Sequence, residues 1–120
     1  QCVIDVVNEE RKKRGLKPLI VSEEVMEFSK EHTEWMVETG NFVHAGDMRY
    51  GDCLRKCSIY PSHQTYKEGA MGIVNGWMNS PPHKKVIMGD YIYCGSSTGY
   101  YKRNEFTNSY DIYTTFSVVW

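Results

Sequence analysis

The chain has 120 residues, of which 41% are hydrophobic and 24% are charged. This length and composition are typical of one globular domain with one core, so we predict a single domain over residues 1–120. Fourteen basic and fifteen acidic side chains give a formal net charge of -1, which excludes a strong overall field that would attract nucleic acid or an anionic membrane. No apolar stretch approaches the roughly 18 residues that span a bilayer, so no transmembrane segment is expected. Because the chain opens with Gln1 and Cys2, we expect that any targeting segment has been removed.

The first third of the chain predicts two helices. Apolar residues recur three and four apart over 2–14, and Gly15 ends the pattern as a helix C-terminus usually ends. The basic run at 11–14 lies in the last turn, where cations favour the negative end of the helix dipole, so we interpret it as structural and not as a binding patch. Ser22 precedes two glutamates and a second apolar stripe that ends at Gly40, which predicts the longest helix here.

The middle of the chain predicts a long loop and two more helices. Residues 41–64 show no period and contain glycines, a proline and two cysteines, so we expect an ordered surface loop. Thr65 and Glu68 form a T-x-x-E capping box, and the helical stripe that follows has Trp77 at its centre as an expected anchor of the core. Three glycines in this helix suggest that another backbone approaches it closely. Ser80-Pro81-Pro82 then ends the helix and begins a shorter one.

The last third of the chain predicts strands. Residues 91–97, 99–103 and 110–120 are rich in Tyr, Ile, Thr, Phe and Val and are separated by turn residues, so we expect three strands joined by hairpins. Helices first and strands last predict an α+β layered domain. The tyrosines of these strands could offer a stacking surface for sugars or a groove for lipid, although strand alternation more often buries such residues.

The cysteines suggest the compartment. They form an even set in a small domain: Cys2, Cys53, Cys57 and Cys94. Such a set is typical of disulfides in an oxidising compartment, so we expect all four to be oxidised and the chain to be secreted or at the cell surface, with three pairings possible. A structural zinc site is the alternative, because Cys53 and Cys57 have C-x₃-C spacing and are flanked by His44 and His63. A disulfide is the favoured interpretation.

Three motifs follow one another in an order that is typical of one known family. Residues 8–11 read N-E-E-R and 15–19 read G-L-K-P-L, similar to a bacterial N-x-x-R pattern followed by G-L-x-P-L. The stretch 36–44 has a methionine followed, after a glycine, by a histidine, and 77–83 read W-M-N-S-P-P-H, where the bacterial pattern is W-M-N-S-P-G-H. The chain therefore resembles, over essentially its whole length, the CAP superfamily (cysteine-rich secretory, antigen 5 and pathogenesis-related proteins), most closely short bacterial SCP-like domains. The resemblance implies a three-layer α-β-α sandwich with a small antiparallel sheet of about three strands.

The resemblance also implies a shallow cleft whose floor carries two histidines, which are His44 and His83 in this sequence. Neutral imidazoles from two segments are good ligands for Zn²⁺ or another divalent ion, so we predict that this pair binds metal. Because two ligands alone make a weak site, low occupancy is expected, and solvent would complete the coordination.

The cleft acids that accompany these histidines in the family are missing at their usual places. The first would fall within 54–58, which contains no carboxylate, and the second falls at Ser80. Glu68 is the nearest later acid, but its place in the capping box gives it a structural role. Asp47 or Asp52 could fold back into the cleft, and both are interpreted more simply as loop residues. Without an acid to orient a histidine base, catalysis is not supported.

We therefore expect a secreted or cell-surface binding module with a histidine-lined cleft. Its partner could be a small ligand, a lipid, a glycan or a protein, and nucleic acid is not expected. One alternative is a degenerate hydrolase of protease or esterase type that uses Ser80 with His83 or His44, in which case Ser80 and Glu68 are the catalytic candidates. The other is a purely structural extracytoplasmic scaffold.

Overall fold

The computed structural model describes residues 2–47, 49–59, 65–104, 106 and 109–120. Within these residues the elements are, in chain order, α1 (Cys2–Lys13), β1 (Ile20–Val21), α2 (Glu23–Thr39), β2 (Gly51–Ile59), α3 (Tyr66–Met78), α4 (Pro81–Ile87), β3 (Tyr93–Asn104) and β4 (Ser109–Val119). The strands form one sheet in the order β1-β3-β4-β2, with β1 parallel to β3 and the other neighbours antiparallel. Among these residues, no helix has both the length and the apolar character that crossing a membrane requires.

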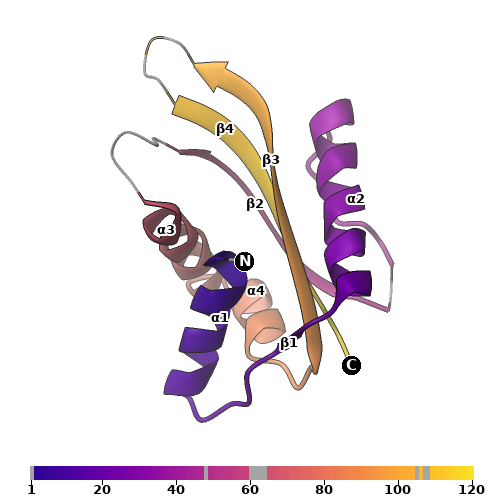
Figure 1. The fold of residues 1–120 in the computed structure, drawn as a ribbon, viewed down its shortest axis with the longest axis vertical. Coiled ribbons are helices and arrows are strands. Elements are labelled where there is room, and N and C mark those ends of the chain that lie inside the picture. The colour runs from indigo at the N-terminus through magenta and orange to yellow at the C-terminus, as the bar shows by residue number, and fades with distance from the viewer. Residues whose placement is uncertain (1, 48, 60–64, 105, 107–108) are drawn as a thin grey trace.

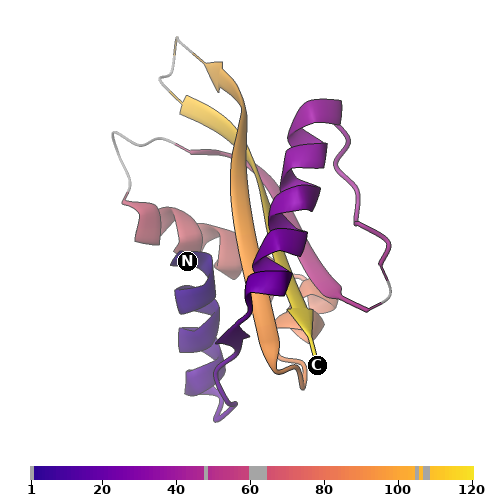
Figure 2. The same ribbon diagram turned by 45° about the vertical axis from the view of Figure 1, so that its right-hand side comes forward.

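The elements make three layers. Helix α2 covers one face of the sheet, while α1, α3 and α4 cover the other (Figures 1 and 2). The larger core lies on the side of the three helices, where Trp77 is 1% exposed and packs beside Phe116 of β4. The predicted α-β-α sandwich and the expected role of Trp77 as a core anchor are therefore confirmed, with the short parallel strand β1 as an addition to the sheet.

Two of the helix ends that the sequence predicted are formed as expected, whereas Ser22 occupies the N-cap position of α2 without a capping hydrogen bond from its side chain. Gly40 closes α2 in the left-handed conformation, with φ of 72°, and its backbone N–H donates to the Met36 carbonyl. Thr65 and Glu68 form the reciprocal capping box at the start of α3. These signals are local, so the sequence alone specifies them.

The N-terminal motif has a structural role. Asn8 exchanges two hydrogen bonds with the backbone of Leu19, and Arg11, which is 3% exposed, donates to the carbonyl oxygens of Lys17, Ile87 and Gly89. The motif therefore ties α1 to the chain that enters β1 and to the end of α4.

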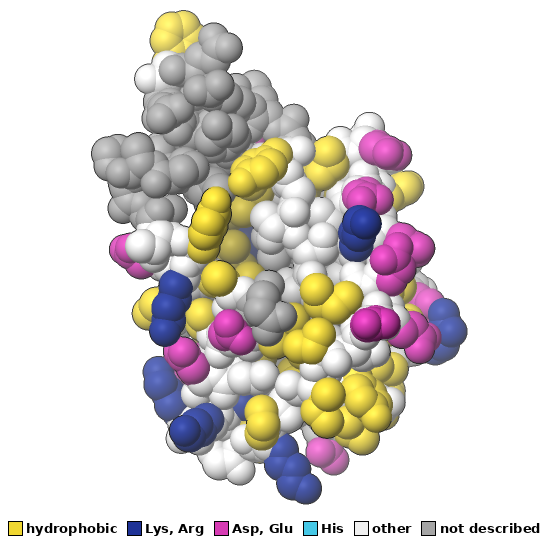
Figure 3. Space-filling view, in the orientation of Figure 1, with side chains coloured by type: hydrophobic (Ala, Val, Ile, Leu, Met, Phe, Trp, Pro, Cys, Tyr) yellow, Lys and Arg dark blue, Asp and Glu magenta, His cyan; other side chains and the backbone are white. Residues whose placement is uncertain are grey.

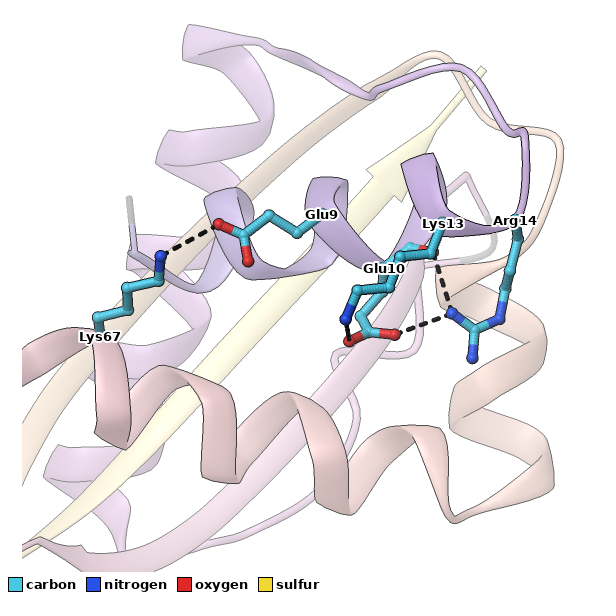
Figure 4. Close-up of polar contacts among 5 residues, drawn as sticks. All are labelled: Glu9, Glu10, Lys13, Arg14 and Lys67. Carbon is cyan, nitrogen blue, oxygen red and sulfur yellow. Dashed lines mark hydrogen bonds and ion pairs between the residues drawn. The ribbon is translucent and has the colours of Figure 1, made fainter.

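The last two residues of the basic run are also engaged with neighbouring groups. Lys13 and Arg14 both pair with Glu10 one turn earlier, and Lys67 of α3 reaches Glu9 across the helices (Figure 4). These pairs are exposed, so each contributes little to stability, but they fit the structural interpretation of the basic run.

The segment 51–59 corrects the loop that was expected over 41–64. It is a nine-residue edge strand, β2, and it pairs with β4 from Gly51↔Val118 to Ile59↔Tyr110. β2 lies at the edge of the sheet, so one of its two sides has no neighbouring strand. Among the β2 residues whose burial is described, Cys53 and Leu54 are the buried ones. The apolar alternation of β2 is therefore too short to be recognised from the sequence.

Glycines in β3 explain a second difference. The structure has one continuous strand over 93–104 where two were expected. A Cβ atom at Gly95 would lie 2.3 Å from the backbone carbon of Val25, and one at Gly99 would lie 3.0 Å from the Val37 side chain, so both glycines let α2 approach the sheet. The close backbone approach that the sequence predicted for the glycines of α3 is not found at Gly69 and Gly72, which face open space.

Candidate functional site

The first predicted cleft histidine has a carboxylate partner. His44 lies in the segment between α2 and β2, and Asp52 is the second residue of β2. The His44 Nδ1 and Asp52 Oδ1 atoms are 2.5 Å apart, and the Ala45 N–H donates to the other Asp52 oxygen at 3.5 Å. The His44 side chain is 60% exposed and that of Asp52 only 13%. Since Nδ1 faces Asp52, the His44 Nε2 atom is the nitrogen left for a ligand or a proton.

The second histidine stands beside this pair. His83 lies in the first turn of α4 and is half-buried, with its ring centroid 6.5 Å from that of Trp77. Its backbone carbonyl accepts a hydrogen bond from the Cys53 thiol of β2 at 3.6 Å. Burial lowers the pKa of His83, the charge of His44 lowers it further, and Asp52 opposes both effects. His83 therefore lies within electrostatic reach of the His44–Asp52 pair, and we call these three side chains the histidine cleft, after the cleft that the family resemblance implies.

A guanidinium adjoins the histidine cleft on β2. Arg55 places its Nη1 atom 3.2 Å from the point where a Cβ on Gly76 of α3 would sit, and it also lies beside the Cys57 thiol. Its charge contributes to the lowered pKa of His83. The sequence reasoning did not single out Arg55, because it placed 54–58 in a loop.

Asp52 corrects the argument that no acid could orient a histidine. We interpreted it as a loop residue, whereas β2 holds it against His44. Asp47, the other candidate, pairs with Arg49 in its own turn. No local signal marks Asp52, because the strand that holds it depends on pairing positions of β4 that lie more than fifty residues further along the chain.

Glu68 and Ser80, the two catalytic candidates, both lie at helix N-termini. Glu68 is exposed at the start of α3, and its carboxylate accepts a hydrogen bond from the Thr65 N–H at 3.1 Å, as a capping box requires. Ser80 occupies the N-cap position of α4 without a capping hydrogen bond from its side chain. Its hydroxyl forms no hydrogen bond with His44 or His83, both of which the structure describes.

The donor set does not make a preformed metal centre. In the described ranges, no three His, Cys, Asp or Glu side chains gather in a way that could hold a metal ion. Asp52 is paired with His44, and Arg55 brings positive charge to the same place. His63, which completed the alternative zinc site with Cys53 and Cys57, lies outside the described residues. Zinc binding by His44 and His83 therefore stays a prediction.

All four cysteines are free thiols, so the structure does not support the disulfide prediction. Cys53 and Cys57 are four residues apart on β2, which separates their Cα atoms by about 13 Å, whereas a disulfide needs less than about 7 Å. Strand β4 separates β2 from Cys94 on β3. Burial raises the pKa of Cys53 and raises that of Cys94 to about 11, so both behave as small core residues.

A hollow adjoins His44 on the side of α2. It has a volume of about 320 Å³ and is lined by Phe28, Glu31, His32, Trp35, His44 and Ala45. Trp35 is 41% exposed and stacks against His32, whose Nε2 atom lies 2.7 Å from the Val43 carbonyl oxygen. The aromatic wall and the imidazole edge give this hollow the mixed character that small-molecule sites share.

The strand tyrosines divide between core and surface. Tyr113 is buried, whereas Tyr93 and Tyr100 are exposed. Hydrophobic side chains gather on the lower part of the face in Figure 3, over the region where β1 and the C-terminus lie in Figure 1. Exposed Ile20 and Val21 belong to β1 and Trp120 to the C-terminus.

The layer order defines a three-layer α-β-α domain. The family model described as the cysteine-rich secretory protein family, CAP, matches residues 4–117. The chain belongs to this family, which confirms the resemblance read from its motifs.

One curated relative and two solved structures show what the chain is similar to, and the two structures are described as an extracellular protein and an outer surface protein. The uncharacterized protein YkwD of Bacillus subtilis is 32% identical over 96 residues, which cover 72% of this chain and 36% of that protein. An SCP-domain extracellular protein of Bacillus anthracis has a TM-score of 0.69 at 16% identity, over 98% of this chain and 38% of the other. An outer surface protein of Borrelia burgdorferi has a TM-score of 0.63 at 18% identity, over 98% and 89%. The chain thus spans about a third of the curated relative that it matches.

Proposed function

We propose that the chain is a binding domain that acts outside the cytoplasm, as a secreted or cell-surface protein, and that its ligand docks at the histidine cleft. The observation that carries the proposal is the exposed His44 imidazole, held by the mostly buried Asp52 carboxylate beside the half-buried His83. Such an arrangement presents hydrogen-bonding groups at fixed positions, which lowers the entropic cost of binding. The hollow beside His44 adds aromatic surface to the same place.

The proposed location draws support from the relatives, which are described as an outer surface protein and an extracellular protein. Fractionation of the native host, with an antibody against this chain, tests the location. Recovery of the chain in the cytoplasmic fraction would contradict it.

The binding proposal is tested with defined probes. Labelled protein is applied to a glycan array, to purified peptidoglycan and to phosphatidylglycerol vesicles. For the probe that retains the wild type, we expect His44→Ala and His83→Ala to weaken retention at least tenfold, while the exposed control Lys67→Ala retains wild-type binding. Equal retention by all four proteins would favour the structural scaffold instead.

One observation favours a second candidate function, a hydrolase. A carboxylate that orients a histidine is the arrangement that activates water or a hydroxyl as a general base. Ser80 forms no hydrogen bond with either histidine, so the geometry favours a hydrolase in which His44 activates a water molecule and not the Ser80 hydroxyl. If the chain hydrolyses ester or peptide substrates, Asp52→Asn and His44→Gln should each lower kcat at least a hundredfold. Turnover that is absent, or unchanged in both variants, leaves binding as the function.

A further inference from the structure

A positive charge stands where the family resemblance leads one to expect a cleft acid. Arg55 lies within 54–58, and alternation along β2 puts it on the same face as Cys53. The Cys53 thiol donates to the His83 carbonyl, and the Arg55 guanidinium lies over Gly76 at 3.2 Å from its Cβ position. Two successive residues on this face of β2 thus reach the segment 76–83, which carries His83.

The acids near Arg55 are engaged elsewhere. Asp52 is bound to His44, and Asp111 of β4 accepts a hydrogen bond from Ser58 at 2.5 Å. Among the residues that the structure describes, no carboxylate forms an ion pair with Arg55. Its neighbours are the Cys57 thiol and Gly76, which leave guanidinium donors available to a ligand.

We propose that the histidine cleft, together with Arg55, binds a ligand through a carboxylate or phosphate group. This inference rests on the proposed binding function and names the chemical class of the ligand. The planar guanidinium matches the oxygens of both groups with paired N–H donors, and a ring N–H of His83, whose segment contacts the same face of β2, adds a donor. His44, whose Nδ1 atom faces Asp52, presents a donor at Nε2 when its ring carries both protons. A divalent cation would meet repulsion from the same guanidinium, so the cleft favours an anion over a metal.

Two glycines of α3 provide a matched pair of variants. Gly76→Ala would place a methyl group 3.2 Å from the Arg55 Nη1 atom, so the guanidinium would have to shift by a few tenths of an ångström, whereas Gly72→Ala would meet nothing within 4 Å. Both changes replace glycine by alanine inside one helix, so both should stabilise α3 to a similar extent. A difference between them in ligand binding therefore reports the position of Arg55 and not the stability of the helix.

The test is an NMR titration of the imidazole resonances with sodium phosphate and, separately, sodium acetate, at pH 7.5, at constant ionic strength set with NaCl and in buffers freed of metal ions with a chelating resin. We expect saturable shifts of the His83 and His44 resonances with at least one of the two anions. Arg55→Gln should weaken the apparent Kd at least tenfold and Arg55→Lys less, while Arg49→Gln, which removes an exposed arginine paired with Asp47, should match the wild type.

Several results would overturn the inference: shifts that stay linear, shifts that appear only when Zn²⁺ is added back, or wild-type affinity in Arg55→Gln. If Arg55→Gln fails to fold, the glycine pair decides. Gly76→Ala should then bind at least threefold more weakly than Gly72→Ala, and equal binding overturns the inference. Retention of a cell-surface probe that depends on His44 and His83, without any response to phosphate or acetate, would refute the anion and leave the binding function standing.

Discussion

Replacing Trp77 by alanine is the sharpest test of how the domain is held together. The indole is 1% exposed, lies 6.1 Å from the ring of Phe116, and donates its N–H to the Leu54 carbonyl of β2 at 2.9 Å. Truncating a buried tryptophan costs about 3 to 5 kcal/mol. The lost hydrogen bond to a buried carbonyl lies within that cost and accounts for about 1 kcal/mol of it. Because small domains have total stabilities of about 5 to 15 kcal/mol, the variant should be close to unfolding at 37 °C.

Urea unfolding, followed by far-UV circular dichroism, measures the effect, since the tryptophan fluorescence itself changes. Trp77→Phe is the control: it keeps an aromatic ring in the core and loses the N–H donor, so we expect a smaller cost of about 1 to 2 kcal/mol. A cost below about 1 kcal/mol for Trp77→Ala, with an unchanged m-value, would show that α3 does not face the sheet as described.

Four further outcomes follow from the structure. Gly95→Ala should destabilise the domain by more than about 2 kcal/mol in the same urea assay, because its Cβ would lie 2.3 Å from the α2 backbone, and a neutral result would contradict that approach. Alkylation with iodoacetamide should spare the buried Cys53 and Cys94 in the native state and label both thiols after denaturation, whereas unlabelled denatured protein would restore the disulfide prediction. Because the pKa of His83 is lowered in the fold, the unfolded chain binds more protons below about pH 6.5, so stability should fall as the pH drops from 7 towards 5 and the fall should be smaller in His83→Asn. In calorimetry, any Zn²⁺ binding should be weaker at pH 5.5 than at pH 7.5 and absent from the double variant His44→Ala with His83→Ala, and equal binding by both proteins would place the ion elsewhere.

The helices and their ends were predictable because their signals are local. The capping box of Thr65 and Glu68 and the glycine that ends α2 lie within a few residues of the backbone groups that they satisfy. The same holds for the short helix that begins after Ser80, where two prolines suit the first turn. The family resemblance then supplied the layer order, which local patterns alone could not give.

The edge strand and the site residues on it were not predictable by the same means. The residues of β2 gain their extended form from β4, whose pairing positions lie more than fifty residues further along the chain. Asp52 and Arg55 therefore had the sequence character of loop residues, and no local pattern separates a loop aspartate from one that a strand holds against His44. The free cysteines follow the same logic, since an even count suggests pairing and only the strand geometry shows that Cys53 and Cys57 are too far apart.

Stability and the histidine cleft depend on the same four residues of β2. Asp52 orients His44, and the Cys53 thiol donates to the His83 carbonyl. The Leu54 carbonyl accepts the Trp77 N–H, and the Arg55 guanidinium lies over Gly76. The bond from Trp77 links the middle of this stretch to the core, so a loosened β2 would move the groups on either side of Leu54 together. Trp77→Phe should therefore weaken phosphate or acetate binding even where the domain remains folded, whereas an equally destabilising change in α2 should not.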